Sequence, residues 1–225
     1  MRRTSKSIIA GILLSLATAA FSGAAQAAAC VSDTLDKYTA PGFTCSIGDM
    51  TFANFTWTPS STAGGSAPPA TSEMAVPDGL GFDLDGLFTA SSGATADAIL
   101  HYTVTTTDAT DTIDRVRLYG VGGQSGTGTG GVDEVLCVGG LLGACPAGGN
   151  YMPSVTGNGV AAQVVFAGAD EVDTRKDMYT AGGSSGLATL SSVTNIVDQP
   201  VPEPSSLALL AAGLLGLGAL RAYRR

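Results

Sequence analysis

Alternation of apolar and polar residues in short segments is the feature that most restricts the fold of this chain. In the segment 98–106, Leu100, Tyr102 and Val104 fall on one face of an extended strand, as in a β-strand with one buried side. Segments of the same kind are 50–57, 113–119, 132–138, 160–166, 171–179 and 187–197. Turn residues separate them, and no internal segment keeps an apolar stripe at helical spacing. The pattern predicts an all-β fold, an antiparallel β-sandwich of the jelly-roll or Ig-like kind, with the Ser-, Gly- and Pro-rich stretch 59–69 as a linker.

The N-terminal segment predicts export. Arg2, Arg3 and Lys6 precede an apolar run at 8–20, and a small-x-small pattern follows it. This is the layout of a secretory signal peptide, and its apolar part is too short for a membrane-spanning helix. We expect a signal helix in residues 1–27, removed by signal peptidase. The predicted cleavage-site residues are Ala25, Ala27 and Ala28.

The C-terminal segment has three parts in a fixed order. Pro202-Glu203-Pro204 comes first, the run 207–220 contains only Leu, Ala and Gly, and Arg221, Arg224 and Arg225 end the chain. As a helix, these 14 apolar residues would span about 21 Å, against a hydrocarbon core of about 30 Å. The run therefore predicts a marginal transmembrane helix from Leu207 to Leu220, with the arginines as a stop on the cytoplasmic side.

These three parts together resemble the PEP-CTERM sorting signal of exported proteins from Gram-negative, exopolysaccharide-producing bacteria. The resemblance implies transient membrane anchoring, cleavage near Pro202-Glu203-Pro204 by an exosortase, and then release or attachment at the cell surface. Internal stretches, among them 45–55 and 191–195, also resemble an ectodomain type that recurs on such proteins, which implies a fold and a location but no activity. The expected organisation is a signal peptide (1–27), a β-sandwich ectodomain (28–198) and a sorting signal (199–225).

The charge of the predicted mature region restricts the kinds of partner that it can bind. Residues 28–201 contain five basic and 18 acidic side chains, a net charge near −13. This charge opposes nucleic-acid binding, which needs a basic surface, and favours solubility or the attraction of divalent cations. Asp83-Leu84-Asp85-Gly86 matches the start of a calcium loop, but the remaining ligand spacing is missing. Asp83 and Asp85 are therefore weak candidates for a calcium site, and no cofactor is expected.

The four cysteines indicate disulfide bonds in an oxidising compartment. They are Cys30, Cys45, Cys137 and Cys145. Four cysteines allow three pairings, and sequence alone does not choose among them. Local closure, Cys30–Cys45 with Cys137–Cys145, is preferred because short loops close at lower entropic cost.

Three sequence features that could indicate a catalytic or binding site are better explained by a structural role. Residues 182–186 match the G-x-S-x-G nucleophile elbow, but a strand pattern follows where a helix is required, so we expect a glycine-rich hairpin turn. The single histidine, His101, falls on the face opposite Leu100 and Tyr102, and is expected at the surface. Trp57 is expected to pack in the core. No catalytic residues are predicted.

The leading functional hypothesis is therefore a non-catalytic, exported surface or extracellular-matrix protein, sorted by an exosortase and associated with exopolysaccharide or biofilm. The first alternative is a carbohydrate- or calcium-binding β-sandwich module. The second is a secreted polysaccharide hydrolase, for which no acid, base and nucleophile set is evident.

Overall fold

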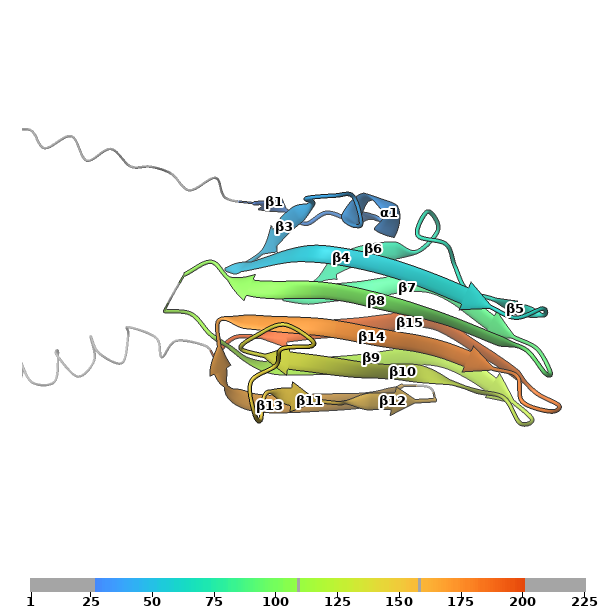
Figure 1. Cartoon of the computed structure of the whole chain (residues 1–225). Coiled ribbons are helices and arrows are strands. Elements are labelled where there is room, and N and C mark those ends of the chain that lie inside the picture. Colours follow the sequence, from blue (N-terminus) through green and yellow to red (C-terminus); the bar gives the residue numbers. More distant parts are fainter. Residues whose placement is uncertain (1–26, 109, 158, 201–225) are drawn as a thin grey trace, which may run out of the picture.

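Strands of two sheets make up most of the domain in the computed structural model, which describes residues 27–108, 110–157 and 159–200. Sheet A has the strand order β1-β3-β4-β8-β14-β10-β11, and β12 also pairs with β10. Its strands are β1 (Ala28–Ala29), β3 (Thr44–Ile47), β4 (Met50–Ser61), β8 (Thr95–Thr106), β10 (Thr129–Val138), β11 (Asn150–Tyr151), β12 (Ser154–Thr156) and β14 (Glu171–Ala181). Sheet A faces the viewer in Figure 1.

Sheet B lies behind sheet A and has the order β13-β9-β15-β7-β6-β2, with β5 also paired to β7. Its strands are β2 (Asp33–Thr34), β5 (Gly65–Ser66), β6 (Met74–Asp78), β7 (Gly81–Ala90), β9 (Ile113–Ser125), β13 (Val160–Ala169) and β15 (Leu187–Asp198). The predicted all-β, two-sheet fold is confirmed. The connections β7–β8, β9–β10 and β14–β15 each cross from one sheet to the other, so tight turns at the ends of the sandwich join the two sheets.

The inward faces follow the alternation in the sequence. Leu100, Tyr102 and Val104 of β8 are all buried, and so are Val193 and Val197 of β15 in the facing sheet. Full burial of one such aliphatic side chain is worth about 1.5–3 kcal/mol. Aromatic rings fill the end of the core next to the short helix α1 (Leu35–Tyr38). They belong to Tyr38, Phe43, Phe52, Phe55, Phe82 and Tyr102.

Two expectations about the strands need correction. The stretch 59–69 is not a linker, because β4 continues to Ser61 and β5 pairs with β7. Pro59 is tolerated because β3 pairs only with the first residues of β4, which leaves Pro59 on an open edge. The sheets are not purely antiparallel either, since β1 pairs parallel to β3.

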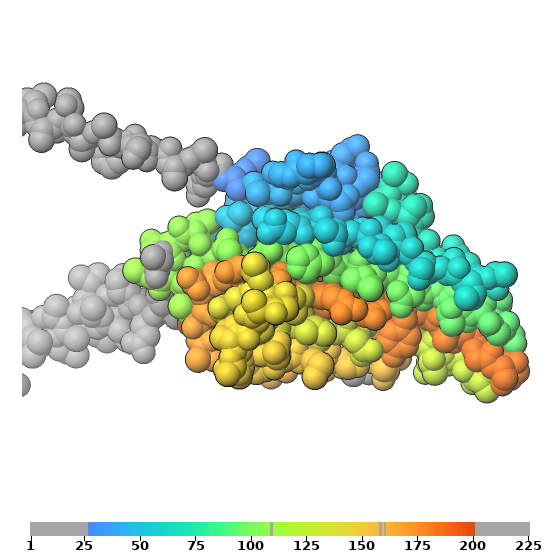
Figure 2. All heavy atoms as spheres, in the orientation of Figure 1, coloured from blue at the N-terminus to red at the C-terminus, as the bar shows by residue number. Residues whose placement is uncertain are grey.

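Both disulfides of the preferred pairing are present. Cys30–Cys45 ties the segment after β1 to β3, and Cys137–Cys145 closes the loop that follows β10. This loop lies over the outer face of sheet A, where the amide of Leu142 donates to Oδ2 of Asp173 on β14 at 2.8 Å. Figure 2 shows the loop (yellow) projecting from that face.

The described chain begins and ends at the same end of the sandwich, with β1 and the end of β15 at the left in Figure 1. The predicted signal helix and the predicted transmembrane helix lie outside the described residues. Within the described part, no helix is long and apolar enough to cross a membrane.

Candidate functional site

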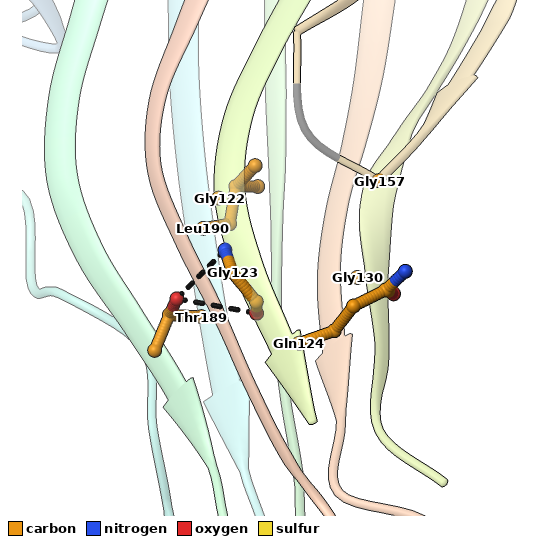
Figure 3. A pocket seen from close by; sticks show the side chains of 7 residues that line it. All are labelled: Gly122, Gly123, Gln124, Gly130, Gly157, Thr189 and Leu190. Atoms are coloured by element: carbon orange, nitrogen blue, oxygen red, sulfur yellow. Dashed lines mark hydrogen bonds between the residues drawn. The ribbon is translucent and has the colours of Figure 1, made fainter. Parts of the chain in front are cut away.

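A glycine-lined pocket of about 290 Å³ opens beside β9 and β10 (Figure 3). Its walls are Gly122, Gly123, Gln124, Gly130, Gly157, Thr189 and Leu190. Glycine is required at position 122, because a Cβ there would overlap the backbone oxygen of Thr189 on β15. Because glycine has no side chain, these positions leave a hollow in the surface, as a binding site requires.

The polar groups of this glycine-lined pocket are uncharged. The Thr189 hydroxyl accepts from the Gly123 amide at 2.9 Å and donates to the Gly123 carbonyl at 3.3 Å, as the dashed lines in Figure 3 show. Gln124 contributes an exposed amide. The lining therefore offers hydrogen bonds to a neutral ligand and has no group for acid–base catalysis.

A second hollow, of about 350 Å³, lies on the outer face of sheet A next to α1, and we call it the His101 hollow. It is lined by residues 39–44, Asn54, Phe55, Thr56 and His101. Asn54 has a positive φ of 60° in the bulge of β4, and its amide donates to Oγ1 of Thr103 at 3.0 Å. The half-buried Phe43 adds an apolar ring. The His101 hollow thus combines an aromatic wall with several hydrogen-bonding side chains, as many ligand sites do.

His101 lies opposite Leu100 and Tyr102, as predicted, and its Nε2 is 2.7 Å from Oδ1 of Asp173. Asp173 is almost fully buried, so this contact fixes the imidazole ring. The G-x-S-x-G serine, Ser184, lies elsewhere, in the turn that joins β14 to β15. Because those strands belong to opposite sheets, the predicted hairpin turn is a crossover turn, and no helix follows it. The structure therefore does not assemble Ser184 and His101 into a triad.

Asp97 and Asp177 form a carboxyl pair that the sequence reasoning missed. Burial, a hydrogen bond with Asp177 and the charge of Asp177 raise the pKa of Asp97 to about 6. Asp177 Oδ1 is buried and has no hydrogen-bond donor. Two carboxyls that share a proton are closer than the roughly 5–9 Å that glycoside hydrolysis requires. The pair does not support the hydrolase alternative.

The weak calcium candidates, Asp83 and Asp85, lie within β7 and not in a loop. Asp83 Oδ1 accepts from the hydroxyls of Ser192 at 2.5 Å and Thr194 at 3.1 Å. The nearby Glu73 is buried, and its pKa is raised to about 8 by burial and by the charge of Asp85. In residues 27–200, apart from the two undescribed positions, no group of three or more acidic, histidine or cysteine side chains is arranged to hold a metal.

The predicted processing sites lie at the margins of the fold. Ala27 accepts a hydrogen bond from Ser46 at 3.1 Å, and Ala28 pairs with Cys45. Ala25, the Pro202-Glu203-Pro204 motif and the three terminal arginines lie outside the described residues. The last described strand, β15, ends at Asp198, directly before the predicted sorting signal.

Comparison with protein families identifies the C-terminal segment. The profile of the PEP-CTERM protein-sorting motif matches residues 200–225. The chain is thus a β-sandwich protein that carries a PEP-CTERM sorting motif. This motif indicates export and sorting to the cell surface and is consistent with processing by an exosortase.

Comparison with solved structures finds carbohydrate-binding modules at low similarity. One is TmCBM61 in complex with β-1,4-galactotriose (TM-score 0.36, 10% identity, 63% of this chain and 88% of that chain). Another is the xylan-binding module CBM86 from Roseburia intestinalis (TM-score 0.23, 11% identity, 64% and 96%). A third is the family 11 module from Clostridium thermocellum (TM-score 0.24, 9% identity, 74% and 96%). These scores are too low to assign a function, and no curated protein matches the chain.

Proposed function

We propose that this protein is a non-catalytic β-sandwich of the cell surface or extracellular matrix, processed by an exosortase and associated with exopolysaccharide. The observation that carries the proposal is the PEP-CTERM motif at residues 200–225, which begins two residues after β15 ends. No membrane segment is then needed in the mature protein, because the predicted membrane helix would be removed with the motif.

The contacts at the two margins support processing that leaves the fold intact. At the C-terminal side, Arg117 donates to both carboxylate oxygens of Asp198 at 2.7 Å, which closes β15 against β9 before the motif begins. At the N-terminal side, cleavage after Ala27 would leave Ala28 in its pairing with β3, and Cys30 in its disulfide. Neither predicted cleavage removes a strand.

The first test is the intact mass of the protein recovered from surface and medium fractions of a host with an exosortase. We expect a species that starts near Ala28 and ends near Val201, with any added mass located at the new C-terminus. The variant Pro202→Ala with Glu203→Ala should keep the residues up to Arg225. Pro59→Ala, an exposed proline of the folded domain, is the matched control and should be processed normally. A wild-type protein that still ends at Arg225 would contradict the proposal.

A carbohydrate-binding role is the second candidate, and the His101 hollow favours it because a ring and several polar side chains meet there. Thr56 and Thr58 are exposed on the same face of β4, but only Thr56 lines the hollow. Glycan-array binding by the wild type should therefore be lost in Thr56→Tyr, which fills the hollow, and kept in Thr58→Tyr. Equal binding by all three proteins would exclude the hollow.

Trp57 is unsuitable for that test. Its indole nitrogen donates to the carbonyl of Pro68 at 3.1 Å, and its ring packs edge-on against Phe88 with the centroids 6.2 Å apart. Trp57 therefore packs against the core, as expected, and Trp57→Ala would report on folding.

A further inference from the structure

A cluster of polar side chains occupies the middle of the hydrophobic core. Its members are Tyr102, Glu134, Lys176 and Asn195, each at most 2% exposed. They come from β8, β10 and β14 of sheet A and from β15 of sheet B. We call this set the core polar cluster.

One carboxylate connects the two nitrogen-bearing side chains of the core polar cluster. Glu134 and Lys176 are directly opposite each other on β10 and β14, and Lys176 Nζ donates to Glu134 Oε1. From the facing sheet, Asn195 Nδ2 donates to the same oxygen at 3.1 Å and to Oε2 at 3.4 Å. The amine of Lys176 and the amide of Asn195 are therefore neighbours across the gap between the sheets.

Tyr102 acts on the other side of the Asn195 amide. Its hydroxyl donates to Asn195 Oδ1, which draws electron density from the amide carbon. The backbone carbonyl of Arg117 accepts from Asn195 Nδ2 at 3.2 Å and holds the amide in this orientation. Lys176 Nζ also lies 5.0 Å from the centre of the Tyr102 ring. The carbonyl carbon of Asn195 is thus polarised and fixed next to an amine.

The ionised form of this cluster is poorly supported by its surroundings. An ammonium group has three donors, and among the described residues Lys176 has one hydrogen-bond acceptor, Glu134. Burial lowers the pKa of Lys176 and raises the pKa of Glu134. Desolvation of a buried ion pair often exceeds its Coulombic gain. These effects favour the neutral amine, which is the nucleophilic form, beside a neutral carboxylic acid.

We propose that Lys176 and Asn195 form an intramolecular isopeptide bond that joins the two sheets, with Glu134 as the group that transfers the proton. This modification is independent of the proposed surface function, since it depends only on the folded domain.

The reaction balances without any co-reactant. The lone pair of Lys176 Nζ attacks Cγ of Asn195, and the hydrogen bond from Tyr102 stabilises the negative charge that develops on Oδ1. Glu134 protonates Nδ2, the Cγ–Nδ2 bond breaks, and Glu134 recovers a proton from Nζ. The products are one secondary amide and one molecule of ammonia, and Glu134 ends in its starting protonated state. No group is oxidised or reduced.

The mass of the folded full-length chain tests the proposal. After reduction of the two disulfides, the wild-type mass should be lower than the sequence mass by one ammonia molecule, allowing for any removed leader. Trypsin should cut after Arg175 but not after an acylated Lys176. Chymotrypsin, which cuts after Tyr179, should then yield a branched peptide that contains both Lys176 and Asn195.

Amine labelling in denaturant gives an independent readout on the wild-type protein. The exposed Lys37 is the internal control and should react fully, whereas Lys176 should not react. Full labelling of both lysines together with an unchanged mass, in protein with both disulfides formed, would overturn the proposal. Loss of a water molecule with a Lys176–Glu134 link would overturn the assignment of Asn195.

Variants locate the reacting groups. Asn195→Ala removes the acceptor carbon, and Glu134→Gln keeps the shape of the side chain but removes the transferable proton. Both should show the full sequence mass and a reactive Lys176. An ammonia loss that persists in Asn195→Ala would assign the modification to another residue and contradict the proposal.

Discussion

Glu134 and Glu73 are two glutamates at the same exposure, 1% each, in opposite surroundings. Glu134 touches an amine and an amide in the middle of the core. Glu73 lies beside Gly86, its Oε2 has no hydrogen-bond partner, and the nearby charge is the carboxylate of Asp85. Burial raises the pKa of both carboxyls, but only Glu134 has groups to which it can pass a proton. Burial therefore favours the protonated form of a carboxyl, whereas the neighbouring groups decide whether that proton can be transferred.

The largest expected effect comes from making Glu134 resemble Glu73. Lys176→Met keeps the chain length but removes the cross-link and leaves Glu134 without its nitrogen-bearing neighbour on β14. We expect a loss of about 3–5 kcal/mol at neutral pH, of which about 3 kcal/mol comes from the missing cross-link and about 1–2 kcal/mol from leaving the buried Glu134 without its partner. Because the folded state then holds a proton that the unfolded chain releases at lower pH, stability should fall further as the pH rises. Urea unfolding at pH 5 and pH 8 measures both effects, and equal stability at the two pH values would contradict this account.

Glu134→Gln removes the proton transfer but leaves no buried charge on that side chain. The isopeptide bond closes a loop of about 20 residues, so its loss should lower the free energy of unfolding by roughly 3 kcal/mol. Urea unfolding together with intact mass checks this prediction. Leu87→Ala, at an exposed position, is the control and should change stability little. If Glu134→Gln loses stability although its mass is still lower than the sequence mass by one ammonia molecule, the cross-link is present in the variant. The loss of stability then cannot come from a missing cross-link, and the explanation is wrong.

Glu73→Gln should become more stable relative to the wild type as the pH rises from 5 toward 8. The folded-state pKa of Glu73 is about 8, above its ordinary value of 4.5. A raised pKa means that the stability contribution is complete below the unfolded pKa and is lost as the pH rises through the folded one. Between pH 5 and pH 7 the wild type should lose roughly 2 kcal/mol from this group, and Glu73→Gln should lack that slope. Unfolding midpoints across this range measure it, and identical slopes in both proteins would refute the assignment.

The smallest effect comes from Asp85→Asn. Asp85 is exposed, and its charge is the second cause of the raised Glu73 pKa, after burial. Removing that charge should lower the Glu73 pKa by less than about one unit, so the upper end of the pH window should move down slightly. Asp78→Asn, at the exposed end of β6, is the matched control. A larger shift in Asp78→Asn than in Asp85→Asn would show that the coupling is not local.

The sequence predicted most of the sandwich because one face of each long strand is apolar. Three members of the core polar cluster also occupy inward positions of this alternation. Glu134 is in phase with Val132 and Leu136. In the same way, Lys176 is in phase with Val172 and Met178, and Asn195 with Val193 and Val197. A charged residue at an inward position was the available signal. The sequence could not show which strands would face each other across the core. That arrangement is set by the crossover turns and not by any local pattern.

The regions that were misjudged have weaker local patterns. β7 contains two aspartates and a glycine in its middle, so Asp83 and Asp85 resembled a loop. β4 extends through proline and serine because its second half has only one neighbour, β8. The Asp97–Asp177 pair depends on the register between β8 and β14, which alternation does not determine.

β15 is the last strand of the domain, yet it lies in the interior of sheet B, between β9 and β7. A surface protein attached through the residues after Asp198 would receive any pull along this strand. The pull would have to shear two hydrogen-bonded ladders at once, and an amide link at Asn195 would pass the force directly to β14 in the other sheet. A sandwich that is attached through the end of β15 would therefore resist mechanical extension most strongly at the strand that receives the force.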